Sequence, residues 1–200
     1  MKKLTEYRAL IVDLDGTLYY QKPVRLAILK EMLFHFWKLP DFLIVKKYRT
    51  LFENGISEKE RLSRLPSQAP RVIREWMIER PYPYIKKNGD YELINVLMEA
   101  QARGIIVIVY SDYPVEEKLS ALGFVPDMAL CSETIGRLKP DASGLKSVLT
   151  QESIVPEQCL VIGDRIDKDG ALADNLDANI LLLSQNPVER GKKYMELGWD

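Results

Sequence analysis

The feature that most constrains the fold of this chain is a set of short apolar runs separated by helical patterns. The runs are rich in Ile, Val and Leu, without alternation of apolar and polar positions, and lie at 8–12, 105–110, 159–162 and 179–183, with a weaker candidate at Met128–Cys131. Such runs are typical of parallel strands buried on both faces. They predict an α/β fold class with a doubly wound, Rossmann-like and mostly parallel sheet.

The segments between these runs predict helices. Periodic apolar positions mark 91–102 and 115–122, which are closed by Gly104 and Gly123, and also 142–150 and 168–176. A helix that connects two strands is the crossover that a parallel sheet requires. We therefore expect a core domain formed by residues 1–20 and 86–200.

Residues 21–85 break the alternation and predict an all-helical domain inserted after the first strand. Ser57 followed by Glu60 predicts a capping box at one of its helices. Pro81, Pro83 and Asn88-Gly89 predict a hinge or linker back to the core. The expected helices are 24–38, 41–53, 57–64 and 69–80.

The inserted domain is basic as well as apolar. Residues 21–80 carry 13 Lys and Arg against 7 Asp and Glu, a net of +6, whereas the other 140 residues carry 15 against 22, a net of −7. We expect the aromatic stretch Leu33–Lys38 to form the core of the insert, and His35 within it to be packed or exposed and not a base. The same composition leaves open an interfacial helix that meets anionic lipid, which would make a lipid phosphate the substrate.

Composition and charge indicate which binding partners and which cellular location to expect. The net charge of −1 gives no indication of nucleic-acid binding. Cys131 and Cys159 lie far apart without a CxxC spacing or a secretory segment, which favours a cytoplasmic protein. Charged residues interrupt the apolar stretch Val24–Leu39 too often for stable membrane insertion. The pattern indicates a soluble protein and leaves its oligomeric state open.

Charged side chains follow the first strand directly, in the sequence DLDGTLYY. Asp13 and Asp15 repel each other unless a cation or a proton intervenes, so the arrangement indicates chemistry. Ser111 follows the second strand and Asp164 the fourth, and the carboxyl ends of parallel strands share one crevice. Lys139 precedes a helix and adds a cation. Several carboxylates and one ammonium group predict a site for phosphate and a divalent metal.

These motifs resemble the four motifs of the haloacid dehalogenase superfamily of hydrolases, and its phosphoglycolate phosphatase-like members in particular. The matching segments are DLDGTLY, IVIVYSD, RLKPD and IGDRIDKDG, in the family's order over about residues 7–183. The insert at 21–85 matches the position of the family's helical type-1 cap. The resemblance implies that the core performs the chemistry and that the cap selects the substrate.

The resemblance also implies an activity and roles. We expect a Mg²⁺-dependent phosphatase that hydrolyses a small phosphorylated metabolite, a phosphomonoester, through an aspartyl phosphate on Asp13. Asp15 would protonate the leaving alcohol and then activate water, with Lys139 as the third catalytic residue. The metal ligands would be Asp13, Asp15 through its backbone carbonyl, and Asp164.

Further residues take supporting roles in the same resemblance. Asp169 would orient Lys139 or a metal-bound water. We expect Asp167 to be a helix N-terminal charge and Arg165 to form a surface ion pair. Tyr19 and Tyr20 could equally line the substrate entrance or begin the linker to the cap. The residues expected to bind the phosphoryl group are Gly16, Thr17, Ser111, Asp112 and Lys139.

Two alternative functions stay open at this point. A phosphotransferase or mutase would use the same residues and exclude water from the aspartyl phosphate. A non-catalytic phosphate-binding or scaffold protein would be free to lose Asp15 and Lys139, and both are present. A dehalogenase is disfavoured, since it needs neither a second acid nor magnesium.

Overall fold

The computed structural model describes residues 3–198, which form two compact units. One unit comprises Met1–Gln21 and Gly89–Asp200, and the other Lys22–Asn88. The chain leaves the first unit after Gln21 and returns to it at Gly89, close to the expected crossings after Tyr20 and Ile85.

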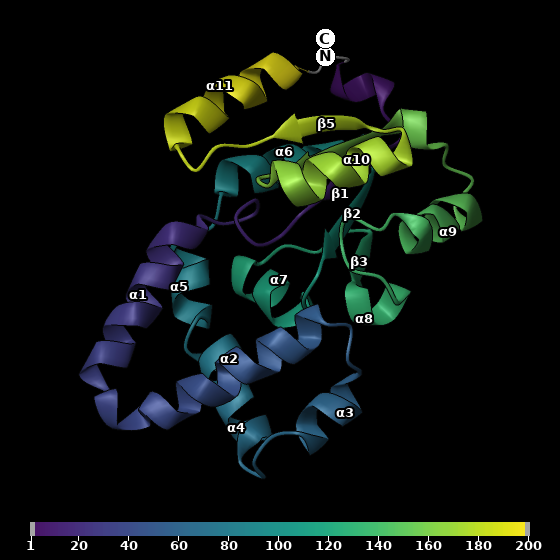
Figure 1. Cartoon of the computed structure of the whole chain (residues 1–200). Coiled ribbons are helices and arrows are strands. Elements are labelled where there is room, and N and C mark those ends of the chain that lie inside the picture. Colours follow the sequence, from purple (N-terminus) through teal and green to yellow (C-terminus); the bar gives the residue numbers. More distant parts are fainter. Residues whose placement is uncertain (1–2, 199–200) are drawn as a thin grey trace. The chain divides into compact units, whose positions relative to one another are not determined.

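The first unit is built on a five-stranded parallel sheet in the order β3-β2-β1-β4-β5. This confirms the predicted α/β, Rossmann-like fold class. Figure 1 labels β1, β2, β3 and β5 of this sheet. Central β1 has all four residues buried, as expected of a strand covered on both faces. The strands are β1 (Ala9–Val12), β2 (Ile106–Ser111), β3 (Met128–Cys131), β4 (Cys159–Gly163) and β5 (Asn179–Leu182).

The sheet order brings the ends of three strands together. β1 pairs with β2 on one side and β4 on the other, so that Val12 lies between Val109 and Ile162. The residues that follow these strands therefore leave the sheet at one edge. From β1 the chain first adds β2 and β3 on one side of the sheet and then crosses over to add β4 and β5 on the other side. Open α/β sheets bind ligands at such a switch point, which here lies between β1 and β4.

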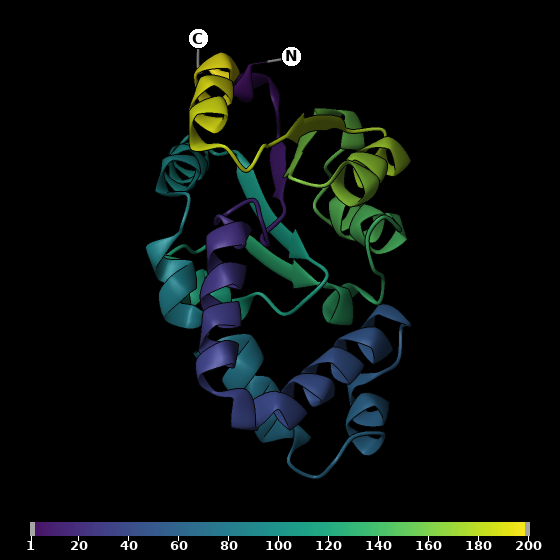
Figure 2. The same cartoon turned by 60° about the vertical axis from the view of Figure 1, so that its left-hand side comes forward.

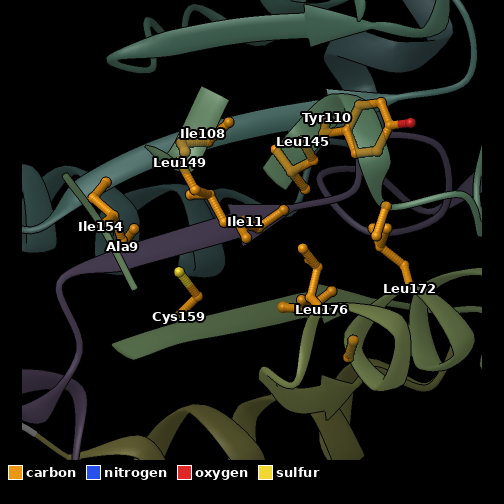
Figure 3. Close-up of a cluster of buried hydrophobic side chains, with 13 residues drawn as sticks. Ala9, Ile11, Ile108, Tyr110, Leu145, Leu149, Ile154, Cys159, Leu172 and Leu176 are labelled. Atoms are coloured by element: carbon orange, nitrogen blue, oxygen red, sulfur yellow. The ribbon is translucent and has the colours of Figure 1, made fainter. Parts of the chain in front are cut away.

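Helices cover both faces of this sheet. On one face, Ile11 and Ile108 pack against Leu145 and Leu149 of α9 and Leu172 of α10 in the buried cluster of Figure 3. On the strands, alternate residues face the opposite way and are also fully buried. The helices of this unit are α6 (Tyr91–Ala102), α7 (Glu116–Leu122), α8 (Ser132–Ile135), α9 (Ser143–Gln151), α10 (Ala171–Leu176) and α11 (Pro187–Leu197).

Two of these helices differ from the sequence prediction. The helix expected at 168–176 begins earlier, with a π-helical turn (Ile166–Gly170) that leads into α10. α11 was not predicted, although its start carries a recognisable signal: Asn186 caps it by accepting a hydrogen bond from the Val188 N–H, and Pro187 follows.

The second unit is entirely helical, as predicted, and Figure 2 shows its course. Two details of the prediction are wrong. The linker expected after Pro81 contains the helix α5. The expected capping box is absent among residues 3–198: the Ser57 side chain makes no capping bond, and Glu60 pairs with Arg64. The helices are α1 (Gln21–Phe34), α2 (Leu39–Glu53), α3 (Glu58–Ser63), α4 (Ala69–Arg74) and α5 (Tyr82–Lys87), with a 3-10 turn at Phe36–Lys38 and a π-helical turn at Glu75–Glu79.

The core of the helical unit is not the aromatic stretch that we expected. It consists of Ile44 with Ala69, Val72 and Trp76, packed against partly buried side chains that include Ile28 and Met32 of α1. Leu33–Lys38 instead lies where α1 gives way to α2, and its Leu, Phe and Trp side chains are exposed. The prediction was wrong because helical spacing does not say which face of a helix packs inward.

A charged cluster joins the helices of this unit. Arg80 donates to Glu31 of α1 (2.5 Å) and to Glu75 (2.8 Å). Lys38 also pairs with Glu75, and Tyr84 of α5 donates to Glu31 (2.6 Å). These groups tie three separate segments together, which local helix propensity alone would not do.

Within residues 3–198, every helix is too short or too polar to cross a membrane.

Candidate active site

The structure gathers most of the predicted site residues at the carboxyl edge of the sheet. Asp13 follows β1, Asp164 follows β4, and Asp169 lies in the π-helical turn beyond β4. Carboxylate oxygens of these three residues lie within 4.8 Å of one another. Residues separated by about 150 positions thus form one acidic cluster, in which Asp169 takes the place beside Asp13 and Asp164 that we had expected for Asp15.

Lys139 lies among these carboxylates. Its ammonium group is buried and donates to Asp13 Oδ1 (2.7 Å) and to Asp169 Oδ1 (2.8 Å). Burial alone would lower the pKa of Lys139, but Asp13 and Asp169 outweigh this effect and raise that pKa above its ordinary value. Lys139 is therefore a fixed cation beside the expected nucleophile.

One ammonium group does not neutralise the cluster. Burial raises the pKa of Asp13 well above its usual range, because Lys139 offsets only part of the cost. Burial, and then the neighbouring Asp169, likewise raises the pKa of Asp164. A further positive charge would allow both groups to ionise together.

One oxygen of the Asp164 carboxylate is available to bind such a positive charge. Its Oδ2 accepts a hydrogen bond from Gln185 Nε2 (2.9 Å), while its Oδ1 is buried and has no hydrogen-bond partner among residues 3–198. Gly16 lies so close that a Cβ there would be 2.3 Å from Asp164 Oδ2. A buried carboxylate oxygen without a donor, beside a second carboxylate, is a donor set that fits a divalent cation.

Asp169 is less suited to bind a metal directly. Its Oδ1 accepts from Lys139 and its Oδ2 accepts from the backbone N–H of Arg165 (3.1 Å). A Cβ at Gly163 would be 2.3 Å from the Asp169 Cγ, so only glycine allows this close approach. These contacts hold the Asp169 carboxylate against Lys139, and its role in orienting Lys139 or a metal-bound water stays a prediction.

Asp15 is held by two residues that the sequence did not identify as partners. Lys118 of α7 donates to both carboxylate oxygens, each at 2.6 Å, and the hydroxyl of Tyr19 donates to Oδ1. Tyr19 is buried and forms an isolated bridge with Gly89, where the chain returns to the first unit, whereas Tyr20 stacks on the Arg190 guanidinium at 4.6 Å. Lys118 lies in a predicted helix, but nothing in its local sequence marks it as a site residue.

Of the predicted phosphate-binding residues, Ser111 lies at the edge of the sheet, whereas the side chains of Thr17 and Asp112 contact other residues of the site. Ser111 is buried at the end of β2, at the same edge as Asp13. The Thr17 hydroxyl donates to Asp13 Oδ2 (3.1 Å), and Asp112 Oδ1 accepts from the Lys139 backbone N–H (2.8 Å) while its Oδ2 pairs with Lys168. Through these side chains, Thr17 and Asp112 hold Asp13 and the Lys139 loop in place.

A buried arginine fixes the backbone after Asp15. Arg190 of α11 is fully buried and donates to the carbonyls of Gly16, Thr17 (2.8 Å) and Ser184, and to Asp90 Oδ2 (2.8 Å). The hydroxyl of Tyr194 also donates to Asp90 Oδ2. The sequence analysis missed this support, because it did not predict α11 and a lone arginine gives no sign of burial.

Arg165 and Asp167 form the exposed ion pair that we expected for Arg165. Both side chains are more than half exposed, so they contribute little to the site.

The geometry defines a class of protein: an α/β enzyme with an acidic cluster and a buried lysine at the switch point of its sheet. The sequence model of haloacid dehalogenase-like hydrolases matches residues 7–175, and the chain belongs to this family. Among curated proteins no sequence matches.

Solved structures show the same fold at low sequence identity. YfnB of Bacillus subtilis, a HAD-hydrolase solved with magnesium, is 17% identical with a TM-score of 0.60, covering 98% of this chain and 99% of its own. A phosphoglycolate phosphatase assigned in Lactobacillus plantarum is 18% identical with a TM-score of 0.60, covering 96% and 99%. CbbY of Rhodobacter sphaeroides, solved with xylulose-(1,5)bisphosphate, is 16% identical with a TM-score of 0.57, covering 92% and 89%.

Proposed function

We propose that this hydrolase is a Mg²⁺-dependent phosphatase that hydrolyses a small-molecule phosphomonoester, with Asp13 as nucleophile. The observation that carries the proposal is the position of Lys139. Its ammonium group joins Asp13 to Asp169 at the edge of the sheet, where a buried Asp164 oxygen has no donor among the described residues 3–198. A fixed cation beside a carboxylate nucleophile is what phosphoryl transfer to that carboxylate requires.

Catalysis would proceed in two steps. An Asp13 carboxylate oxygen attacks phosphorus, the bond from phosphorus to the alcohol oxygen breaks, and Asp15 gives its proton to the departing alcohol. Water then attacks the aspartyl phosphate while Asp15 takes a proton from it, the bond from phosphorus to the Asp13 oxygen breaks, and phosphate leaves; this restores the Asp13 carboxylate and the protonated Asp15 acid. Lys118 and Tyr19 hold Asp15 in a fixed orientation for both proton transfers.

The magnesium ion would be held by the Asp13 carboxylate, the Asp15 backbone carbonyl and the Asp164 carboxylate. When bound, it supplies positive charge that lets an ionised nucleophile and an anionic substrate share the site. Arg190 keeps the neighbouring Gly16 carbonyl turned inward, and Gln185 donates to that same carbonyl (2.8 Å) and to Asp164.

Lys139 and Ser111 would bind the phosphoryl oxygens, together with the backbone at Gly16 and Asp112. Thr17 and the Asp112 carboxylate would act indirectly, through Asp13 and the Lys139 loop. An ionised Asp112 side chain offers only acceptors and would repel a phosphate, which supports the backbone role for this residue.

The substrate would be a small phosphorylated metabolite, selected by the helical unit acting as a type-1 cap. The assignment of one structural neighbour as a phosphoglycolate phosphatase, and the sugar bisphosphate in another, support this class. We also propose a cytoplasmic location, since Cys131 and Cys159 are both free and buried.

The test is a screen of phosphomonoesters for release of inorganic phosphate, with Mg²⁺ and with EDTA. We expect turnover of at least one substrate with Mg²⁺ and its loss with EDTA. Asp13→Asn should remove activity and keep the circular dichroism spectrum of the wild type, and Asp167→Asn is the matched control that should remain active.

The same screen separates the alternatives. A phosphotransferase or mutase would consume substrate and give a new phosphate ester with little free phosphate. A non-catalytic phosphate-binding protein would give neither product. Undiminished phosphate release in EDTA would contradict the metal assignment.

A further inference from the structure

The helical unit exposes a group of large apolar side chains at one corner. The chain turns sharply where α1 meets α2, through the 3-10 turn at Phe36–Lys38 (Figures 1 and 2). Here six side chains, which we call the corner patch, are each 61–77% exposed. They are Leu33, Phe34, Phe36, Trp37, Leu39 and Leu43.

The corner patch continues along α1. Leu26, Leu29 and Leu33 are spaced three and four residues apart, so they share one face of this helix, and all are exposed. The opposite positions Ile28 and Met32 pack into the unit's core. The helix is therefore apolar on an inner and an outer face, and packing within the unit explains only the inner one.

Contiguous exposed apolar side chains of this size mark an interaction site more often than scattered ones do. Trp37 packs against Phe36 with ring centroids 5.4 Å apart and against His35 at 5.2 Å. These contacts join the aromatic rings to one another and still leave the Trp37 and Phe36 faces open to solvent.

Most of the charged residues along α1 and around the corner patch are basic. The helical unit, residues 22–88, carries 15 Lys and Arg against 7 Asp and Glu, a net of +8. Lys22, Arg25 and Lys30 of α1 and Lys46 of α2 are exposed. The acidic residues in 21–43 are Glu31, whose carboxylate is bound by Arg80 and Tyr84, and Asp41, which lies between Leu39 and Leu43.

We propose that the corner patch docks on the surface of an anionic lipid bilayer. The Phe, Trp and Leu side chains would enter the boundary between headgroups and acyl chains, while the flanking Lys and Arg contact anionic headgroups. A projecting turn between two helices can enter a bilayer surface without breaking helical hydrogen bonds. This docking is independent of the proposed phosphatase activity.

The charge distribution favours lipid over a second copy of the chain. A symmetric contact between two corner patches would bring two units of net charge +8 together, and like charges across an interface are unfavourable. An anionic membrane surface attracts the same charges. Each Lys or Arg near the surface increases the affinity for the membrane about fivefold.

Flotation with vesicles tests the apolar part. The wild type should float with phosphatidylcholine vesicles that contain about one-third phosphatidylglycerol, and bind pure phosphatidylcholine at least about tenfold less. Combined Phe34→Ser, Phe36→Ser and Trp37→Ser changes should weaken binding by about tenfold for each aromatic side chain. The matched control is Val125→Ser, Val188→Ser and Met195→Ser, which alters three side chains of the other unit that are 68–81% exposed, and should bind as the wild type does.

Two further measurements test the charge and the geometry. Lys22→Gln with Lys30→Gln should weaken binding by about twenty-five-fold, whereas Lys146→Gln should leave it unchanged. Lipids brominated near the interface should quench a component of the tryptophan fluorescence that is missing in Trp37→Phe, a variant that keeps an apolar ring.

Failure of the wild type to float with anionic vesicles would overturn the proposal, as would equal flotation of the triple Ser variant. Sedimentation equilibrium identifies the alternative occupant. A dimer that the triple Ser variant converts to monomer, without vesicle binding by the wild type, would assign the corner patch to a second copy.

Discussion

Arg190→Met is the substitution whose cost follows most directly from the structure. The wild-type guanidinium is fully buried and joins α11 to Asp90 at the start of α6 and to the loop after Asp15. Removing it leaves Asp90 as a buried carboxylate without its cation. It also leaves the carbonyls of Thr17 and Ser184 without the Arg190 donor, whereas the Gly16 carbonyl keeps its hydrogen bond from Gln185.

The expected loss of unfolding free energy is about 3–4 kcal/mol. Breaking a buried ion pair by removing one partner costs about 3–5 kcal/mol. Asp90 keeps hydrogen bonds from the Tyr194 hydroxyl (2.7 Å) and the Leu93 backbone N–H (3.1 Å), which places the loss toward the lower end of that range.

Urea unfolding followed by circular dichroism measures this loss. Arg165→Met, which breaks the exposed pair with Asp167, is the matched control and should cost about 0–1 kcal/mol. Adding Asp90→Asn to Arg190→Met should recover part of the stability, because the unpaired charge is gone. If Arg190→Met costs no more than Arg165→Met, the buried clamp does not stabilise the core and the reasoning is refuted.

Three other changes test the site and the helical unit. Lys118→Met should lower kcat by about tenfold or more for alkyl phosphates. The loss should be much smaller for p-nitrophenyl phosphate, because its leaving group needs little protonation. Equal losses on both substrates would contradict the role given to Asp15. Gly163→Ala should displace Asp169 from Lys139 and lower kcat by about a hundredfold or more without unfolding the protein, which activity and circular dichroism together check. The hydrogen bond from Lys38 lowers the pKa of Glu75 in the folded unit. The Glu75 carboxylate therefore stabilises the folded unit at pH values above the ordinary Glu pKa of about 4.3. This contribution is lost as the pH falls through the lowered pKa of the folded state. The unfolding free energies of wild type and Glu75→Gln should therefore converge below about pH 4, and a pH-independent difference would count against the ion pair.

The sheet and the acidic cluster could be predicted from the sequence because both depend on short-range patterns. A fully buried parallel strand needs a continuous apolar run, and the next residue must lie at the edge of the sheet, which places Asp13, Ser111 and Asp164 near one another. The role of each in catalysis stays a prediction.

The side chains that support the site could not be predicted in the same way. Lys118 and Arg190 contact groups a hundred or more positions away, and the sequence around each resembles that of any exposed helix. The corner patch shows the opposite error, since Phe34 and Trp37 look like core residues and are exposed. In both cases burial depends on tertiary packing, which a local pattern does not contain.

The most direct test of the proposed function is to locate the phosphoryl group during turnover. Asp15→Asn, mixed with p-nitrophenyl phosphate and Mg²⁺ and quenched in acid, should accumulate a phosphorylated enzyme, because transfer to Asp13 needs little acid help and its hydrolysis lacks a base. Peptide mapping by mass spectrometry should place the added phosphoryl group on Asp13. A phosphoryl group on Ser111 or on any residue other than Asp13, or turnover by Asp13→Asn, would contradict the account.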